Sequence, residues 1–198
     1  VWCPSLVVTK NKTYLSASAW PADEGHEGYK KHSRIVVAEI NPITFRPISQ
    51  FQTLSFLNDG KILHNPRCVY DSDENLILFY TEFYEGEYKR IGVARLNQFT
   101  LDIQEIKNDL FPNFRLRRDD LSRLQGPTNP SPLQLSDGSW DILFRSTEGP
   151  NKRRQIYSAS ARTPFSEWSS PENLFKKGDI EDVAIWLDGD VERGIIRD

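Results

Sequence analysis

The fold is decided by the stretch HNPRCVY at residues 64–70, which is followed at residues 76–82 by LILFYTE. The first stretch places an Asn-Pro pair ahead of an apolar run, and the second is rich in residues that favour β-strands. The residues between them, DSDEN, tolerate the backbone angles of a tight turn. The two stretches therefore predict antiparallel strands joined as a hairpin.

The same order of features returns elsewhere in the chain. An X-Pro pair with its apolar run stands at residues 2–8 and 128–135, and a fourth unit starts at residues 180–186 with Val183 in the place of the proline. The second strands of the units are expected at residues 13–20, 76–82 and 140–146, the third strands at 33–40, 90–95 and 155–161, and outer fourth strands at 52–56, 101–106 and 168–175.

Four antiparallel strands repeated at a period of ~50–65 residues are typical of the blades of a β-propeller. We therefore predict an all-β protein, a single β-propeller domain over residues 1–198 with four-stranded antiparallel blades. A β-sandwich also has many short strands, but it does not need one opening motif at regular intervals. Each proline is expected at the start of its strand, where a missing N–H has little effect. The blades are expected at about residues 1–60, 61–125, 126–178 and 179–198, with a short helix near residues 117–125.

Composition narrows the class of protein. Charged residues make up 27% of the chain and apolar residues 38%, which indicates a globular protein. The net charge of −3 and the scattered basic residues argue against a nucleic acid partner. No apolar stretch approaches the ~18 residues of a membrane span, so no membrane partner is predicted. The chain opens VWCP, which we interpret as a mature or trimmed form, and a secreted or periplasmic location is favoured over the cytoplasm.

The sequence predicts neither a cofactor nor a metal site. Its two cysteines, Cys3 and Cys68, are interpreted as separate thiols rather than as a disulfide, and two are too few for a zinc knuckle. P-loop, GxSxG, HExxH and EF-hand patterns are all absent from the sequence.

The repeated unit resembles the blades of carbohydrate-active enzymes with five-bladed propellers, above all glycoside hydrolase family 43 and its relatives. In that group the inner strand of a blade tends to open with an acidic residue, a proline and an apolar run. The third strand carries small residues and is followed by a Pro-Trp turn, and the segment YSASARTPFSEW at residues 157–168 looks like that strand and turn. The resemblance covers most of the chain. It implies a five-bladed propeller, of which about three and a half blades are visible, with a C-terminal portion still to come, and a glycosidase whose partner is an oligosaccharide or polysaccharide.

The resemblance also implies carboxyl groups at the starts of inner strands, because glycoside hydrolysis takes one protonated and one ionised carboxyl group on either side of the bond. The sequence departs from this pattern, since Cys3, Asn65 and Asn129 stand directly before the three prolines. A thiol is a poor general base for water, and a neutral Asn cannot abstract a proton. The chain is therefore an altered catalyst, a protein that binds glycans without cleaving them, or a protein outside the family.

Four carboxylates are the catalytic candidates. Glu181 lies two residues before Val183 and matches the family's Glu-x-Pro acid, so it is predicted to be the general acid. Asp182 is adjacent and could take either role. Glu82 and Glu148 follow matching second strands and are predicted as replacement carboxylates, against the plainer interpretation that each is a surface residue.

Residues at the starts of inner strands and at the ends of second strands should share one mouth of a propeller. There Trp2 and Trp20, with Tyr29 of the long loop at residues 21–31, offer aromatic faces for sugar rings. Two arginines near the axis would suit a carboxylate and raise a sialidase-like alternative for acidic sugars, although no intact Asp-box is present. The other tryptophans, Trp140, Trp168 and Trp186, are expected to pack in the core. The predicted substrate-binding residues are Trp2, Trp20, His64, Asn65, Arg67, Asn129 and Arg145.

Overall fold

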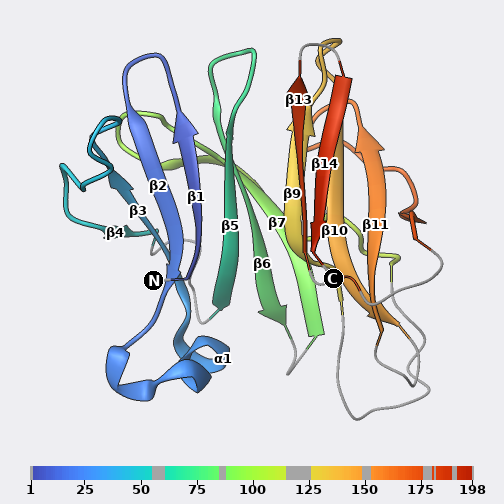
Figure 1. The fold of residues 1–198 in the computed structure, drawn as a ribbon, viewed down its shortest axis with the longest axis horizontal. Helices are drawn as coiled ribbons and strands as arrows, with labels where there is room; N and C mark the ends of the chain where they lie inside the picture. Colours follow the sequence, from blue (N-terminus) through green and yellow to red (C-terminus); the bar gives the residue numbers. More distant parts are fainter. Residues whose placement is uncertain are drawn as a thin grey trace.

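The computed structural model of the chain describes residues 2–54, 61–84, 88–114, 126–148, 153–175, 180, 182–188 and 191–197. Within these ranges the strands form three four-stranded antiparallel sheets and one two-stranded sheet, and each sheet uses strands that are consecutive in the chain (Figure 1). The predicted four-stranded antiparallel blades are thus confirmed. The described sheets do not close a ring, so five blades stay a prediction. The helix expected near residues 117–125 lies outside the described residues.

The sheets follow the order of the sequence. The first contains β1 (Trp2–Val8), β2 (Thr13–Ala19), β3 (Arg34–Glu39) and β4 (Gln52–Thr53); the second contains β5 (Ile62–Tyr70), β6 (Leu76–Tyr84), β7 (Tyr88–Leu96) and β8 (Ile103–Lys107). The third contains β9 (Thr128–Gln134), β10 (Trp140–Glu148), β11 (Arg153–Ala161) and β12 (Glu172–Asn173), and the last pairs β13 (Asp182–Asp188) with β14 (Val191–Arg197). The strands of each sheet fall inside the range predicted for one blade, while a single domain over all 198 residues stays a prediction.

Each inner strand contains a β-bulge at its X-Pro pair. The register of pairing shifts between Trp2 and Ser5 in β1 and between His64 and Arg67 in β5, and β9 shifts at the same place. The residues before the prolines, Cys3, Asn65 and Asn129, have φ of 49°, 52° and 54°. The expectation that proline starts the strand is therefore wrong. Proline lies inside the strand, where the bulge removes the need for its missing N–H.

Side-chain hydroxyl groups link the second strand of one blade to the inner strand of the next. The backbone N–H of Asn65 donates to Ser18 Oγ of the preceding blade at 2.9 Å, and the N–H of Asn129 donates to Thr81 Oγ1 at 3.2 Å. Ser18 and Thr81 occupy equivalent positions, since each pairs with the residue directly before the bulge. The bulge frees an N–H from the strand ladder, and the neighbouring blade accepts it.

Apolar side chains fill the spaces between the sheets. One buried cluster joins the first and second blades, and a second joins the second and third blades around Phe79, Trp140 and Phe144. Trp140 is 1% exposed and Trp168 packs against the same cluster, as expected. Trp186 was expected in the core but is 46% exposed, because no described sheet covers that face of β13.

Candidate functional site

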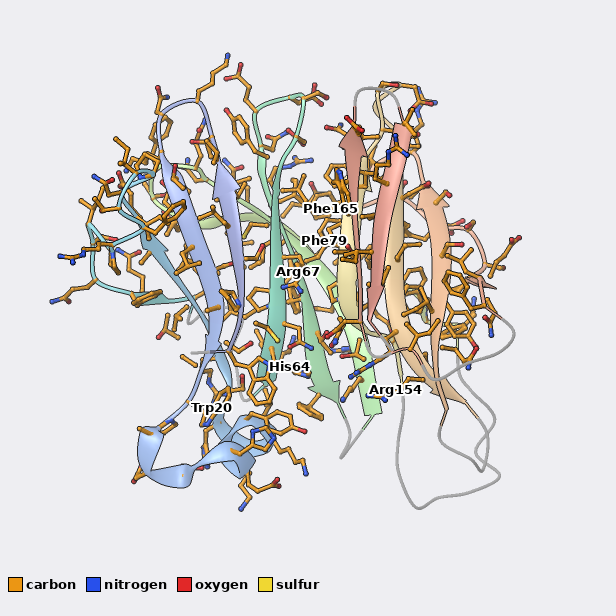
Figure 2. All side chains as sticks on the ribbon, viewed as in Figure 1. Trp20, His64, Arg67, Phe79, Arg154 and Phe165 are labelled. Atoms are coloured by element: carbon orange, nitrogen blue, oxygen red, sulfur yellow. The ribbon has the colours of Figure 1, made fainter. Side chains whose placement is uncertain are left out.

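A cavity of about 150 Å³ opens where β2 ends and where β5 and β9 begin. This is the end of the sheets that also carries the short helix α1 (Tyr29–His32), as Figure 1 shows. Trp20 and His64 lie at this end in Figure 2. The cavity is lined by Trp2, Cys3, Ser18, Trp20, His26, Tyr29, His64, Asn65, Lys89, Asn129, Arg145 and Asp182.

The structure brings most of the predicted site residues together. Those that line the cavity are Trp2, Trp20, His64, Asn65, Asn129, Arg145 and Asp182. Arg67 and Glu82 are not among its lining residues. Glu181 lies outside the described residues, as does the side chain of Glu148.

A chain of amide and carboxylate groups crosses the axial side of the cavity. Asn65 Nδ2 donates a hydrogen bond to Asn129 Oδ1, and Asn129 Nδ2 donates to the carboxylate of Asp182. Thr128 Oγ1 adds a second donor to Asn129 Oδ1 at 2.9 Å. The three residues come from successive inner strands, β5, β9 and β13. These hydrogen bonds orient both Asn side chains. The series of donors ends on the Asp182 carboxylate and holds that carboxylate in position.

Cys3 occupies the equivalent bulge position in the first blade. Its side chain is half-buried, and burial is the main cause that raises the pKa of its thiol above the ordinary value. Arg67 and Arg145 act in the opposite direction, and Asp182 adds to the rise. The thiol therefore stays protonated at neutral pH, which fits a polar wall rather than a base or a nucleophile.

Aromatic rings form the outer wall of the cavity. The ring centroid of Trp2 lies 4.7 Å from that of His26 and 5.9 Å from those of both Trp20 and Tyr29. His26 and Tyr29 come from the predicted long loop, which folds into two 3-10 turns, η1 (Ala22–Glu24) and η2 (His26–Gly28), followed by α1. Trp20 Nε1 donates to the carbonyl of Gly25 at 2.7 Å and so holds the loop against the end of β2. Flat apolar faces of this kind suit the C–H surfaces of sugar rings.

The loop packs tightly at Gly28. A Cβ atom at this position would lie 2.6 Å from Cδ1 of Trp20 and 2.8 Å from Cβ of Glu24. Real Cβ contacts are not this short, so the absence of a side chain at Gly28 lets α1 approach Trp20 closely. The wall of aromatic rings therefore depends on this glycine.

His64 forms the floor of the cavity beneath Tyr29. Its ring stacks on Phe83 with centroids 4.6 Å apart, and the residue is 5% exposed. Its Nε2 atom is buried and has no hydrogen-bond partner among the residues that the structure describes. The pKa of His64 is lowered to about 3, mainly by burial and also by charge repulsion from Lys89. His64 is therefore neutral at physiological pH, and its imidazole can exchange a hydrogen bond with a ligand hydroxyl group.

Two cations line the cavity. Arg145 was predicted, whereas Lys89 of β7 was missed by the sequence interpretation. Lys89 Nζ lies 5.0 Å from the centre of the Phe83 ring, a cation–π distance that places the ammonium group beside His64. The charge of Lys89 and of Arg145 also acts on His64. Lys89 lies near the start of β7, on the third strand of its blade rather than on an inner strand, where the sequence interpretation did not look.

Glu82 does not line the cavity, and its side chain is instead buried in an ion pair. It is 1% exposed and makes a two-point ion pair with Arg90, with Oε2 at 2.9 Å from Nε and Oε1 at 3.0 Å from Nη2. Consecutive residues of a strand point to opposite faces. Thr81 faces the third blade, so Glu82 points to the opposite side of its sheet. Arg67 donates to the carbonyl of Pro66 at 3.2 Å and approaches Cys3 along the inner strands.

We expect His64 to make stability fall with acid. The unfolded histidine has a pKa near ~6.5, whereas that of folded His64 is about 3, so between these values the unfolded state binds more protons. The free energy of unfolding should therefore decrease as pH falls from about 6.5, by up to about 1.4 kcal/mol for each pH unit. Urea denaturation of the wild type and of His64→Asn between pH 4 and 8 measures this difference. A constant difference over that range would contradict the burial of a neutral imidazole.

The fold is that of a β-propeller and is similar to the propellers of solved glycoside hydrolases. The resemblance inferred from the sequence is confirmed at the level of the fold. An endo-arabinase from Bacteroides thetaiotaomicron VPI-5482 has a TM-score of 0.69 and 16% identity, covering 99% of this chain and 74% of its own. A thermostable family-43 glycoside hydrolase gives 0.61 and 16%, covering 94% and 61%. Zg3597, a family 117 glycoside hydrolase of Zobellia galactanivorans, gives 0.74 and 11%, covering 100% and 62%.

At these sequence identities the similarity shows a common fold, and it does not show a common activity. The chain spans about three fifths of the length of the latter two structures. No protein-family model and no curated protein matches the sequence. Within the described ranges, no helix is long and apolar enough to cross a membrane. Three or more His, Cys, Asp or Glu side chains do not gather as a metal site anywhere in the same ranges.

Proposed function

We propose that this protein binds a glycan through the axial cavity and hydrolyses it as a glycoside hydrolase. The observation that carries the proposal is the combination, in one cavity, of an aromatic wall around Trp2 and Trp20 with convergent polar groups on the axis. Carbohydrate sites combine such rings with a few well-placed hydrogen-bonding groups. The propeller fold shared with glycoside hydrolases supports the same conclusion.

The proposed catalytic pair is Glu181 and Asp182. Asp182 lines the cavity, and its carboxylate is oriented by Asn129, so it is suited to act on water or on the anomeric carbon. Glu181 is its neighbour in the sequence and is proposed as the general acid that protonates the leaving oxygen. Glu148, at the end of β10, is the proposed alternative for the second carboxylate. The position of Glu82 lends no support to a catalytic role.

The test uses Glu181→Gln and Asp182→Asn with a panel of aryl glycosides and oligosaccharides. Each substitution keeps shape and removes an acid or base, so kcat should fall by roughly a hundredfold or more. Asp188→Asn, on the same strand and paired with Arg193, is the matched control and should retain activity. Unchanged hydrolysis by Glu181→Gln would remove Glu181 as the acid.

A second candidate function is glycan binding without cleavage. The observation in its favour is that the bulge positions equivalent in the first three blades carry Cys3, Asn65 and Asn129, which cannot serve as general bases at neutral pH. Wild-type protein that binds oligosaccharides in calorimetry and yields no product over long incubation would favour this alternative. Both candidate functions imply a secreted or periplasmic location, because polysaccharides are found outside the cytoplasm.

A further inference from the structure

Arg145 breaks a repeated structural pattern. In the first two blades, Ser18 and Thr81 pair with the residue directly before the bulge and accept the N–H of the next bulge residue. Arg145 pairs with Thr128 and holds the same place in the third blade. A guanidinium group only donates hydrogen bonds, so Arg145 cannot accept an N–H as the hydroxyl groups do. The third blade thus presents a cation to the cavity where the other blades present a structural hydroxyl.

A second cation lines the cavity from a different strand. Lys89 lines the cavity from β7, and Asp182 is the one carboxylate among the lining side chains that the structure describes. Counting Lys89 and Arg145 as +1 each and Asp182 as −1 gives the described lining a net charge of +1. Arg154 occupies on β11 the position of Lys89 on β7, and Figure 2 shows it near the same end of the sheets. Lys89 and Arg145 are therefore the cations that line the cavity among the described residues.

His64, which lines the cavity, has a hydrogen-bonding atom without a described partner. Nε2 of His64 is buried and has no partner among the described residues, although the residue is only 5% exposed. Leaving a buried polar atom unpaired is unfavourable, so it marks a place where a ligand group would be accepted. Because the imidazole ring of His64 is neutral, it offers a ligand a directional hydrogen bond and no net charge.

We propose that the cavity selects a sugar that carries a carboxylate, which is held by Arg145 and Lys89 while a hydroxyl group of the same sugar bonds to Nε2 of His64. The proposal rests on the proposed function and names its substrate class. The planar guanidinium fork matches the two oxygens of a carboxylate, and the ammonium group adds a point charge. The aromatic wall of Trp2 and Trp20 would cover a face of the ring. At about 150 Å³ the cavity is smaller than the ~300–1,000 Å³ of typical ligand pockets, which suits one terminal sugar.

The test compares matched acidic and neutral sugars. One pair is a disaccharide that ends in glucuronic acid and the same disaccharide ending in glucose, and the other pair is sialyllactose and lactose. Binding is measured by calorimetry and by the fluorescence of the tryptophans at the cavity. We expect the wild type to bind the acidic member of one pair at least roughly tenfold more tightly, with an affinity that falls as salt is added.

Variants distinguish the effect of the two cavity cations on binding from the effect of the protein's overall charge. Arg145→Ser restores the residue type of the first blade, and Lys89→Gln removes the other charge. Each should reduce the affinity for the acidic sugar roughly tenfold more than it reduces the affinity for the neutral sugar. Lys10→Gln makes the same change of charge in the β1–β2 turn, at the far end of the sheets, and should have no effect.

The outcomes distinguish the inference from the proposed function. Preference for the glucuronate supports a uronic acid, and preference for sialyllactose supports a sialic acid. Equal binding of acidic and neutral sugars, or an acidic preference that survives in both Arg145→Ser and Lys89→Gln, overturns the inference while the proposed function stands. A wild type that binds and cleaves none of the sugars, neutral ones and the aryl glycosides included, overturns both.

Discussion

Replacing Glu82 with methionine is expected to destabilise the folded protein by roughly 3–5 kcal/mol. The carboxylate is 1% exposed and makes two charge-assisted hydrogen bonds with Arg90, whose side chain is 15% exposed. Removing the acid takes two charge-assisted hydrogen bonds from a guanidinium group in a poorly solvated place. A loss of this size is a large part of the ~5–15 kcal/mol by which most domains are stable.

Urea denaturation with the linear extrapolation of the free energy of unfolding measures this effect. The double variant Glu82→Met with Arg90→Met removes both charges, and it should recover much of the stability that the single variant loses. Glu105→Met is the matched control, because Glu105 pairs with Arg95 on the surface and such pairs contribute about 0–1 kcal/mol. A Glu82→Met variant within 1 kcal/mol of the wild type would contradict a buried pair. Full hydrolysis by a folded double variant would also exclude Glu82 from catalysis.

Trp140→Ala is expected to be equally harmful, by roughly 3–5 kcal/mol. Trp140 is 1% exposed, and its ring centroid lies 5.7 Å from that of Phe79 across the space between the second and third blades. Truncation removes a large apolar surface and leaves a cavity between two sheets that cannot close up freely. Thermal unfolding followed by near-ultraviolet circular dichroism would report a lower melting temperature.

Trp186→Ala provides the comparison within the same residue type. Trp186 is 46% exposed on β13, so its truncation should change the free energy of unfolding by less than about 1 kcal/mol. Equal losses in the two variants would mean that the exposed face of β13 is covered in the folded protein. That result would require another surface to pack there.

The fold could be predicted because the X-Pro pair and the strands after it recur at regular intervals. Residues 64–70 became β5 and residues 76–82 fell in β6, and the other units followed the same plan. The place of Pro66 within its strand could not be predicted, because an X-Pro pair is compatible with either a strand start or a bulge. Only the pairing partner distinguishes the two, and here the shift between His64 and Arg67 reveals the bulge.

The candidate site could be predicted where it depends on strand ends and not where it depends on side-chain direction. Trp2, Asn129 and Asp182 were correctly placed at one mouth because the starts of inner strands must meet there. Glu82 was placed with them by position, but a shift of one residue along a strand turns the side chain to the other face. Lys89 was missed because it lies on the third strand of its blade, whereas the sequence argument placed only inner-strand starts and second-strand ends at the mouth.

The bulges have a consequence for how this protein can change. The left-handed backbone at Asn65 and Asn129 is a conformation that few residues other than glycine adopt readily, and Asn and Asp are the main exceptions. Those two residues have nearly the same shape and differ in whether they can accept a proton. At Asn65 and Asn129 the backbone therefore favours Asn and Asp, which differ by one charge, although Cys3 adopts the same φ in the first blade. A single substitution there could add or remove an acid–base group while the surrounding strands keep their places.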